Sequence, residues 1–176
     1  MANTYEAIAT VTVGSGGAAN IEFTSIPATY TDLKIVFSGR GSFSSVFTYG
    51  LLEFNSSSSS LSSRLLSGEG SGSPYSTTYG SNIAFFANGT TTTSSTFGNA
   101  EIYIPNYTST TTNKSVSIDC VVENNATFGA DNIFAGLWAN TSAITTITIH
   151  AANSSFVKDQ TWSQHSTAYL YGISNA

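Results

Sequence analysis

The stretch Lys114-Ser115-Val116-Ser117-Ile118-Asp119-Cys120-Val121-Val122 decides the fold class, because its side chains alternate between apolar and polar. Successive side chains of a β-strand point to opposite faces, so this pattern predicts a strand with one face in a core. Val116, Ile118 and Cys120 form the apolar side, and we expect Cys120 to be a small buried core residue. Because it is the single cysteine of the chain, an internal disulfide is excluded.

The same alternation recurs on both sides of this stretch. Toward the C-terminus, residues 143–150 place Ile147 and Ile149 on one face, and residues 166–173 alternate Ala168 and Leu170 with Tyr169 and Tyr171. No window of about 11 residues carries the three-and-four spacing of a helix. The expected strands are residues 7–13, 20–24, 31–39, 46–54, 82–87, 98–104, 114–122, 133–138, 143–150 and 166–173.

Turn residues separate these strands at spacings of about ten residues, which is typical of a sandwich or jelly roll. We therefore predict an all-β fold, an antiparallel β-sandwich of about eight to ten strands with a jelly-roll-like topology. The length of 176 residues suits one domain, so residues 1–176 are expected to form a single sandwich. Residues 1–6 are expected to be a short N-terminal arm. Residues 55–81, rich in serine and glycine, are expected to be a long loop region.

Charge is scarce, since charged residues make up 9% of the chain against about 25% in a typical soluble domain. The net charge is −5, and the basic residues are Lys34, Arg40, Arg64, Lys114 and Lys158. So few cations argue against nucleic-acid binding and against docking on an anionic membrane. No apolar run has the length of a spanning helix, and the first residues lack the pattern of a signal peptide. We therefore expect synthesis and folding in a reducing cytoplasm.

Catalytic and metal-binding patterns are missing. A nucleophilic serine needs a base, and the two histidines, His150 and His165, stand in no Gly-x-Ser-x-Gly context. Asp131 and Asn132 follow a glycine and are expected to form a turn, with a calcium site as the alternative. Ten acidic residues leave a carboxylate pair for sugar hydrolysis open, although nothing singles one out. We expect a protein that is not an enzyme and needs no cofactor.

Aromatic residues are the remaining feature, at 12% of the chain. Several stand at strand faces or ends among polar neighbours, where they provide large contact areas with a polar tip. His165, expected in the loop before the last strand, is a further candidate, because histidine often serves as a switch or a ligand contact. The candidate interface or ligand contacts are Tyr5, Tyr103, Tyr107, Trp162, His165, Tyr169 and Tyr171.

Three blocks of sequence resemble a group of bacteriophage virion proteins with cyanophage members. The first is Ser25-Ile26-Pro27-Ala28-Thr29-Tyr30-Thr31-Asp32-Leu33, preceded by Phe23-Thr24. The second is Ala100-Glu101-Ile102-Tyr103-Ile104-Pro105-Asn106-Tyr107, continuing to residues 123–126. The third runs from Gly136-Leu137-Trp138 through residues 143–148 to Ala168-Tyr169-Leu170-Tyr171-Gly172-Ile173. Asn55 is followed by serines, so the chain lacks an "FNGD" phrase associated with relatives.

The resemblance implies a structural β-sandwich of a phage particle, made in the bacterial cytoplasm and located in the virion. One form is a homotrimeric capsid decoration (cement) protein that contacts the major capsid protein and stabilises the shell. The alternative is a tail-fibre or receptor-binding head that contacts host glycan. No catalytic residue comes with the group.

Overall fold

The computed structural model describes residues 4–70, 72–125 and 128–174, and these residues form twelve β-strands and no helix. The all-β prediction is confirmed, with more strands than the sequence indicated. The strands are β1 (Tyr5–Thr12), β2 (Asn20–Phe23), β3 (Asp32–Gly39), β4 (Phe47–Phe54), β5 (Leu61–Glu69), β6 (Tyr75–Tyr79), β7 (Ile83–Asn88), β8 (Gly98–Ile104), β9 (Lys114–Glu123), β10 (Gly129–Trp138), β11 (Ile147–Ala152) and β12 (Thr167–Ile173).

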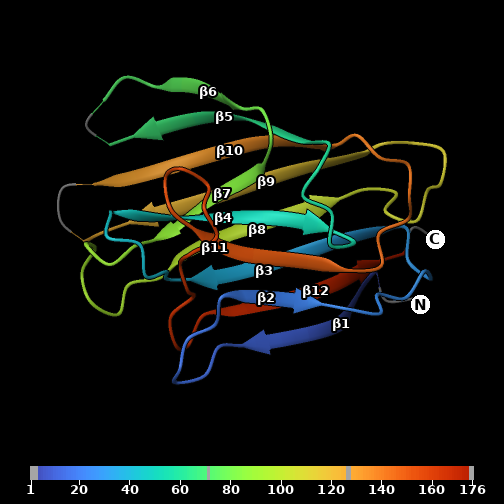
Figure 1. The fold of residues 1–176 in the computed structure, drawn as a ribbon, viewed down its shortest axis with the longest axis horizontal. Helices are drawn as coiled ribbons and strands as arrows, with labels where there is room; N and C mark the ends of the chain where they lie inside the picture. Colours follow the sequence, from blue (N-terminus) through green and yellow to red (C-terminus); the bar gives the residue numbers. More distant parts are fainter. Residues whose placement is uncertain (1–3, 71, 126–127, 175–176) are drawn as a thin grey trace.

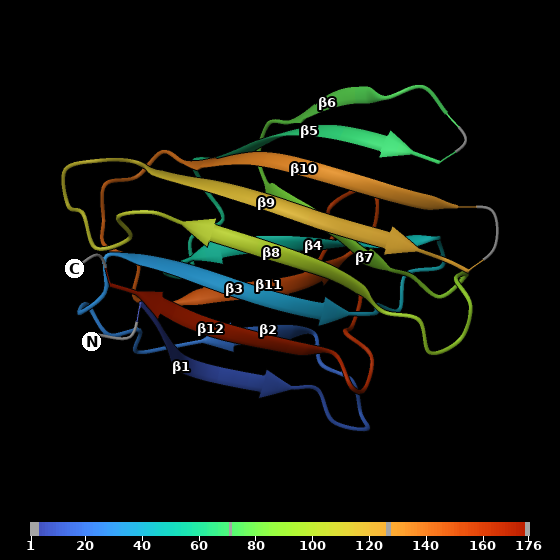
Figure 2. The same cartoon turned by 180° about the vertical axis from the view of Figure 1, so that it is seen from behind.

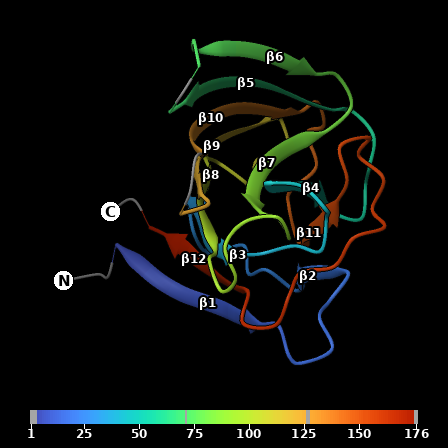
Figure 3. The same ribbon diagram turned by 90° about the vertical axis from the view of Figure 1, so that its left-hand side faces the viewer.

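The strands form two sheets, and every pair of neighbouring strands is antiparallel (Figures 1 and 2). The larger sheet has eight strands in the order β1-β12-β3-β8-β9-β10-β5-β6, and the smaller has four in the order β2-β11-β4-β7. The larger sheet curves around the smaller one (Figure 3). The predicted antiparallel sandwich is therefore confirmed.

The inner faces of the sheets meet in an apolar core. β9 alternates between buried and exposed residues along its whole length, and Cys120 is fully buried, as the sequence predicted. Phe37 of β3 and Phe85 of β7 pack with ring centroids 5.2 Å apart, and Trp162 contacts both rings. Burying each such aromatic side chain contributes on the order of 2–3 kcal/mol, which makes this contact a main tie between the sheets.

A second aromatic cluster lies where the larger sheet curves past β7. Phe86 stacks on Phe47 at 4.4 Å and packs edge-on against Phe134 of β10 at 5.3 Å. Tyr79 of β6 joins the cluster through Phe134 at 6.1 Å and Phe156 at 5.2 Å. These rings attach the far strands of the larger sheet to the smaller sheet, so the far strands do not depend on strand pairing alone.

Residues 55–81 are not one long loop, so that prediction was wrong. β5 and β6 lie within this range and pair as a hairpin. Two serines of β5 are buried and hydrogen-bonded. The Ser63 hydroxyl donates to the carbonyl of Asn82 at 2.9 Å, and the Ser67 hydroxyl donates to Oδ1 of Asn132 at 2.7 Å. Serines that are buried and hydrogen-bonded in this way fit a core-facing strand. The serine-rich composition of the segment nevertheless resembles that of a loop.

Three smaller assignments also differ from the sequence-based ones. Asp131 and Asn132 lie within β10 and form no turn, because both are paired with β5 and β9. Residues 143–146 precede β11, which begins at Ile147. Tyr5 and Glu6 of the expected arm already belong to β1 and pair with β12, while residues 1–3 lie outside the described part of the chain.

Candidate interaction surface

The side of the larger sheet that faces away from the smaller sheet, here called the outer face, carries four of the predicted contact residues. Tyr5 of β1, Tyr103 of β8 and Tyr169 of β12 are exposed, and Tyr171 of β12 is half-buried. Strand register brings Tyr103 and Tyr171 to either side of Lys34 on β3. The outer face therefore gathers tyrosines that are up to 166 residues apart in sequence, from Tyr5 to Tyr171.

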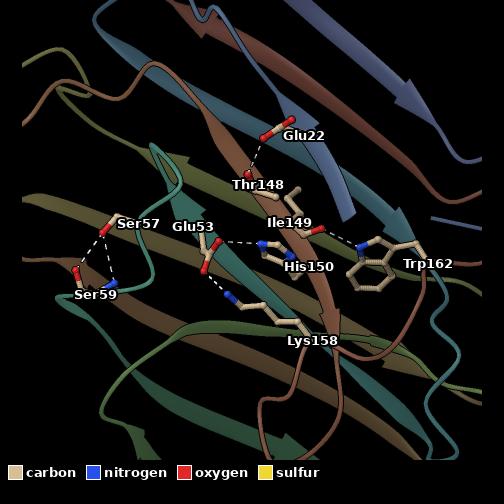
Figure 4. A network of polar contacts seen from close by, with 9 residues as sticks. All are labelled: Glu22, Glu53, Ser57, Ser59, Thr148, Ile149, His150, Lys158 and Trp162. Carbon is tan, nitrogen blue, oxygen red and sulfur yellow. Dashed lines mark hydrogen bonds and ion pairs between the residues drawn. The ribbon is translucent and has the colours of Figure 1, made fainter. Parts of the chain in front are cut away.

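Two predicted contacts are buried, so their assignment to the surface was wrong. The Tyr107 hydroxyl donates a hydrogen bond to the carbonyl of Pro27. Trp162 donates from Nε1 to the carbonyl of Ile149 at 3.0 Å, as Figure 4 shows. Both belong to segments outside the main strands that fold back over the sandwich, and such long-range packing leaves no mark in the local sequence.

His165 lies in an exposed turn before β12, and its backbone has a left-handed φ of 72°. Its backbone N–H donates to the carbonyl of Val13 at 3.0 Å. The turn is at the end of β12 that pairs with Ser38, whereas Tyr171, near the other end of β12, pairs with Lys34. His165 therefore does not join the tyrosines of the outer face.

A shallow hollow of about 280 Å³ lies at the centre of the outer face. It is lined by Tyr5, Lys34, Glu101, Tyr103, Ser117, Ile118, Asp119 and Ile133. Alternation explains which side chains point into the hollow, because the lining residues of β8 and β9 are mostly those whose neighbours point into the core. Sequence analysis identified two of the tyrosines. It missed the charged members because the strand order that brings them together is not readable from the sequence.

The hollow is negatively charged on one side. Glu101 and Asp119 lie directly opposite each other on β8 and β9, where like charges repel. Lys34 neutralises Glu101 through a 2.7 Å ion pair, and this hydrogen bond raises the pKa of Lys34. Among the described residues, the Asp119 carboxylate has no hydrogen-bond or ion-pair partner. A free acceptor beside two tyrosine rings suits a ligand or partner that offers hydroxyl or amide donors.

Apolar residues continue the outer face beyond the hollow. Ile133 of β10 pairs with Leu66 of β5, and these side chains are 54% and 55% exposed. Leu137 and Val121 are exposed on the same face, and two more hollows, of about 230 and 290 Å³, adjoin this patch. Contiguous exposed apolar area of this kind marks interaction surfaces more often than isolated residues do.

A separate polar cluster lies on the smaller sheet (Figure 4). Oε2 of Glu53 lies 2.9 Å from Nε2 of His150, and Lys158 donates a hydrogen bond to the other carboxylate oxygen. Burial raises the pKa of Glu53, but the bonds from Lys158 and His150 outweigh burial and hold that pKa below its ordinary value. Both carboxylate oxygens are occupied by partners, so the cluster fixes the segment around Lys158 to β4 and β11.

Two of the three sequence blocks that resemble virion proteins, the first and the second, contact each other at one end of the sandwich. Asp32 accepts hydrogen bonds from the Tyr103 hydroxyl at 2.7 Å and from the backbone N–H of Asn106 at 2.8 Å. The Tyr107 hydroxyl reaches Pro27 of the first motif. These contacts join β3 to the segment after β8. The residues of the two blocks therefore have a structural role that needs no ligand.

No family model, curated protein or solved structure matches the chain. In the described part of the chain, no helix is long and apolar enough to cross a membrane. The same residues contain no group of three or more His, Cys, Asp or Glu side chains arranged to hold a metal ion.

Proposed function

We propose that this chain is a structural protein of a phage particle, a capsid decoration protein that forms a homotrimer and binds the major capsid protein. The observation that carries the proposal is the outer face, where Tyr5, Tyr103, Ile133 and Leu66 are exposed and line two adjoining hollows that share Ile133. The particle as the setting rests on the sequence resemblance. Weak contacts of this kind become effective when a symmetric assembly repeats them.

We also propose that the sandwich has a jelly-roll topology, and the order of the strands supports this. Without the hairpins β5–β6 and β9–β10, the remaining strands form the sheets β1-β12-β3-β8 and β2-β11-β4-β7. The first four strands of the chain then alternate between the two sheets, and their partners are the last four of these eight strands. Two Greek keys give this nesting in an eight-stranded jelly roll. The two hairpins, joined to each other through β10 and β5, would be insertions that lengthen one sheet.

A tail-fibre or receptor-binding head is the second candidate, and the hollow around Asp119 is the observation that favours it. Sugar rings stack on aromatic side chains, and their hydroxyls donate to carboxylates. Tyr5, Tyr103, Asp119 and Lys34 offer this combination in one place. In this case the ligand would be a host surface glycan.

Copy number and a matched pair of variants separate the two candidates. A decoration protein is expected at on the order of hundreds of copies per particle, because copy number follows the symmetry of the shell. Ile133→Asp should reduce the copies bound to decorated particles at least about tenfold, since it places a charge in a desolvated contact. Val157→Asp is the control, because Val157 is 52% exposed in the segment over the smaller sheet.

Unchanged particle binding by Ile133→Asp would contradict the role of the outer face. A receptor-binding head instead predicts a copy number tens-fold lower. It also predicts binding to host polysaccharide that Tyr103→Ala and Asp119→Asn abolish. Quantitative gel staining of purified particles and a polysaccharide pull-down measure these two outcomes.

A further inference from the structure

The two sheets have four edge strands, β1, β2, β6 and β7. An unpaired strand edge exposes backbone donors and acceptors and invites pairing with another chain, so proteins usually protect it. β7 is protected by side chains of the larger sheet. The Ala84 N–H donates to Oγ of Ser63 at 3.3 Å, and the Phe86 N–H donates to Sγ of Cys120 at 3.4 Å.

β1 and β2 are protected in other ways. β1 carries a bulge between Ala7 and Ala9 and a charge at Glu6, and both disturb a flat edge. β2 is only four residues long and carries Glu22. Bulges, charges and short length are the usual devices against edge pairing, so these edges are closed to a further strand.

β6 is one residue longer than β2 and carries neither a bulge nor a charge. Its residues, Tyr75-Ser76-Thr77-Thr78-Tyr79, include no charge and no proline, and its pairing with β5 shows no bulge. Four of the five are exposed, and only Tyr79 is half-buried. Tyrosine and threonine favour extended backbone, so β6 presents a regular strand with its outer edge open.

We propose that β6 pairs antiparallel with β6 of a second copy of this chain, about a two-fold axis at Thr77. The strand is nearly palindromic, with a tyrosine at each end and hydroxyl residues between them. In this register Thr77 lies opposite the partner's Thr77, and Ser76 lies opposite the partner's Thr78. Tyr75 lies opposite the partner's Tyr79.

The side chains match across such a contact. Aromatic pairs and pairs of hydroxyl residues are favourable directly opposite each other in an antiparallel sheet, and no like charges meet at the axis. Tyr79 already packs against Phe156 at 5.2 Å, so the partner's Tyr75 would extend this aromatic cluster. A two-fold axis places each strand in the same environment, as a closed interface between identical chains requires.

The contact is small, and a small contact area gives a weak association. Five residues on each side bury less area than a stable dimer needs, so the isolated protein is expected to pair only weakly. Many copies held side by side would strengthen the contact through effective concentration. The proposal does not rest on the proposed function, because it is measured on the purified protein alone.

Cysteine cross-linking tests the contact and its register. Cys120, the single native cysteine, is buried, and burial raises the pKa of its thiol to about 12, so it does not compete. Thr77→Cys should form a disulfide-linked dimer under mild oxidation at least about tenfold faster than Thr111→Cys, which places the thiol on an exposed loop. Directly opposite residues bring their Cβ atoms to about 4.5–5.5 Å, which is near the separation of a disulfide, whereas residues in other registers lie farther apart.

Mixtures of two cysteine variants determine the register of the paired β6 strands. Ser76→Cys and Thr78→Cys should cross-link rapidly when mixed and slowly when each is oxidised alone, because only the mixed pair is directly opposite. Thr77→Lys should lower the weight-average mass of the concentrated protein in sedimentation, while circular dichroism stays unchanged. If Thr77→Cys links no faster than Thr111→Cys, or Ser76→Cys links readily to itself, the proposed pairing is wrong.

Discussion

Each end of the sandwich is held by a cation that binds backbone carbonyls and, among the described residues, has no carboxylate as partner. At one end, Arg40 follows β3 and donates to Thr90, Thr92, Thr93 and Thr96 at 2.6–3.2 Å. At the other end, Lys114 begins β9. It donates to the carbonyls of Ser109 and Thr112 at 2.8 Å and of Thr141 at 3.2 Å. Figure 1 shows the two loops at opposite ends of the long axis.

The two ends differ in how many segments the cation joins. All partners of the Arg40 guanidinium lie in one loop of seven residues, 90–96, so this side chain stabilises that loop alone. Lys114 connects the loop before β9 with the segment before β11. Asn55 reinforces the same end, since its Nδ2 donates to the carbonyl of Ala143 at 2.8 Å and its Oδ1 accepts the Thr145 N–H at 2.8 Å. Removing a side chain at the Lys114 end should therefore disorder more of the chain than removing the Arg40 side chain.

Lys114→Met is expected to have the largest effect. Lys114 is 1% exposed, and burial lowers its pKa, yet three carbonyls depend on its ammonium. Removing those bonds should cost about 3 kcal/mol of unfolding free energy, because hydrogen bonds to charged groups are among the stronger ones. Urea unfolding measures it. Lys34→Met, which breaks the more exposed pair with Glu101, should cost less than about 1 kcal/mol. If Lys114→Met and Lys34→Met lowered the unfolding free energy equally, the buried bonds of Lys114 would matter no more than the exposed ion pair of Lys34.

Arg40→Lys is expected to cost about 2 kcal/mol, because an ammonium keeps the charge but lacks the fork that reaches several acceptors. The loss should be local. Hydrogen exchange of residues 90–96 should accelerate, while the backbone amides of β9 and β10 stay protected. Acceleration that spreads to β9 would show that the Arg40 end is coupled to the rest of the sandwich, contrary to its single-loop contacts.

The two cations also show where sequence reasoning stops. Alternation predicted β9 and the burial of Cys120, because side-chain direction in a strand follows from sequence alone. Lys114 gave no sign of burial, since its acceptors are backbone carbonyls, which every residue possesses. For the same reason the hydroxyl-rich β5 resembled a loop. On the outer face, Tyr103 and Tyr169 were predictable from alternation, whereas the meeting of Glu101 with Asp119 depends on strand order.

Tyr107→Phe tests the Lys114 end by a smaller change. The phenol is buried, and its hydroxyl satisfies the Pro27 carbonyl, so removing it should lower the unfolding free energy by about 1 kcal/mol. Thermal unfolding at neutral pH measures the change. Tyr171→Phe serves as the control, since that side chain is half-buried on the outer face and should show little effect. If Tyr107→Phe lowers the unfolding free energy no more than Tyr171→Phe does, the Tyr107 hydroxyl does not help to stabilise the Lys114 end.

Tyr103→Phe should have the smallest effect, and it has a pH signature. The hydrogen bond to Asp32 is the main cause that raises the pKa of Tyr103 to about 12, above its ordinary value of 10.0. The folded state therefore holds this proton more tightly than the unfolded state. The resulting stabilisation is complete below pH 10 and is lost as the pH rises toward 12. Because Tyr103 is 37% exposed, solvent screens the interaction and the loss at pH 7 should stay below about 1 kcal/mol.

The measurement compares the unfolding free energies of the native protein and Tyr103→Phe at pH 9 and pH 11.5. Their difference should shrink at the higher pH, since the unfolded native chain then releases the Tyr103 proton, which favours unfolding, whereas the variant has no proton to release at this position. Tyr169→Phe, on the same face but not bonded to Asp32, should show no such change. A constant difference between native protein and Tyr103→Phe would mean that Asp32 is held by Asn106 alone, and that the Lys114 end joins fewer segments than the contacts indicate.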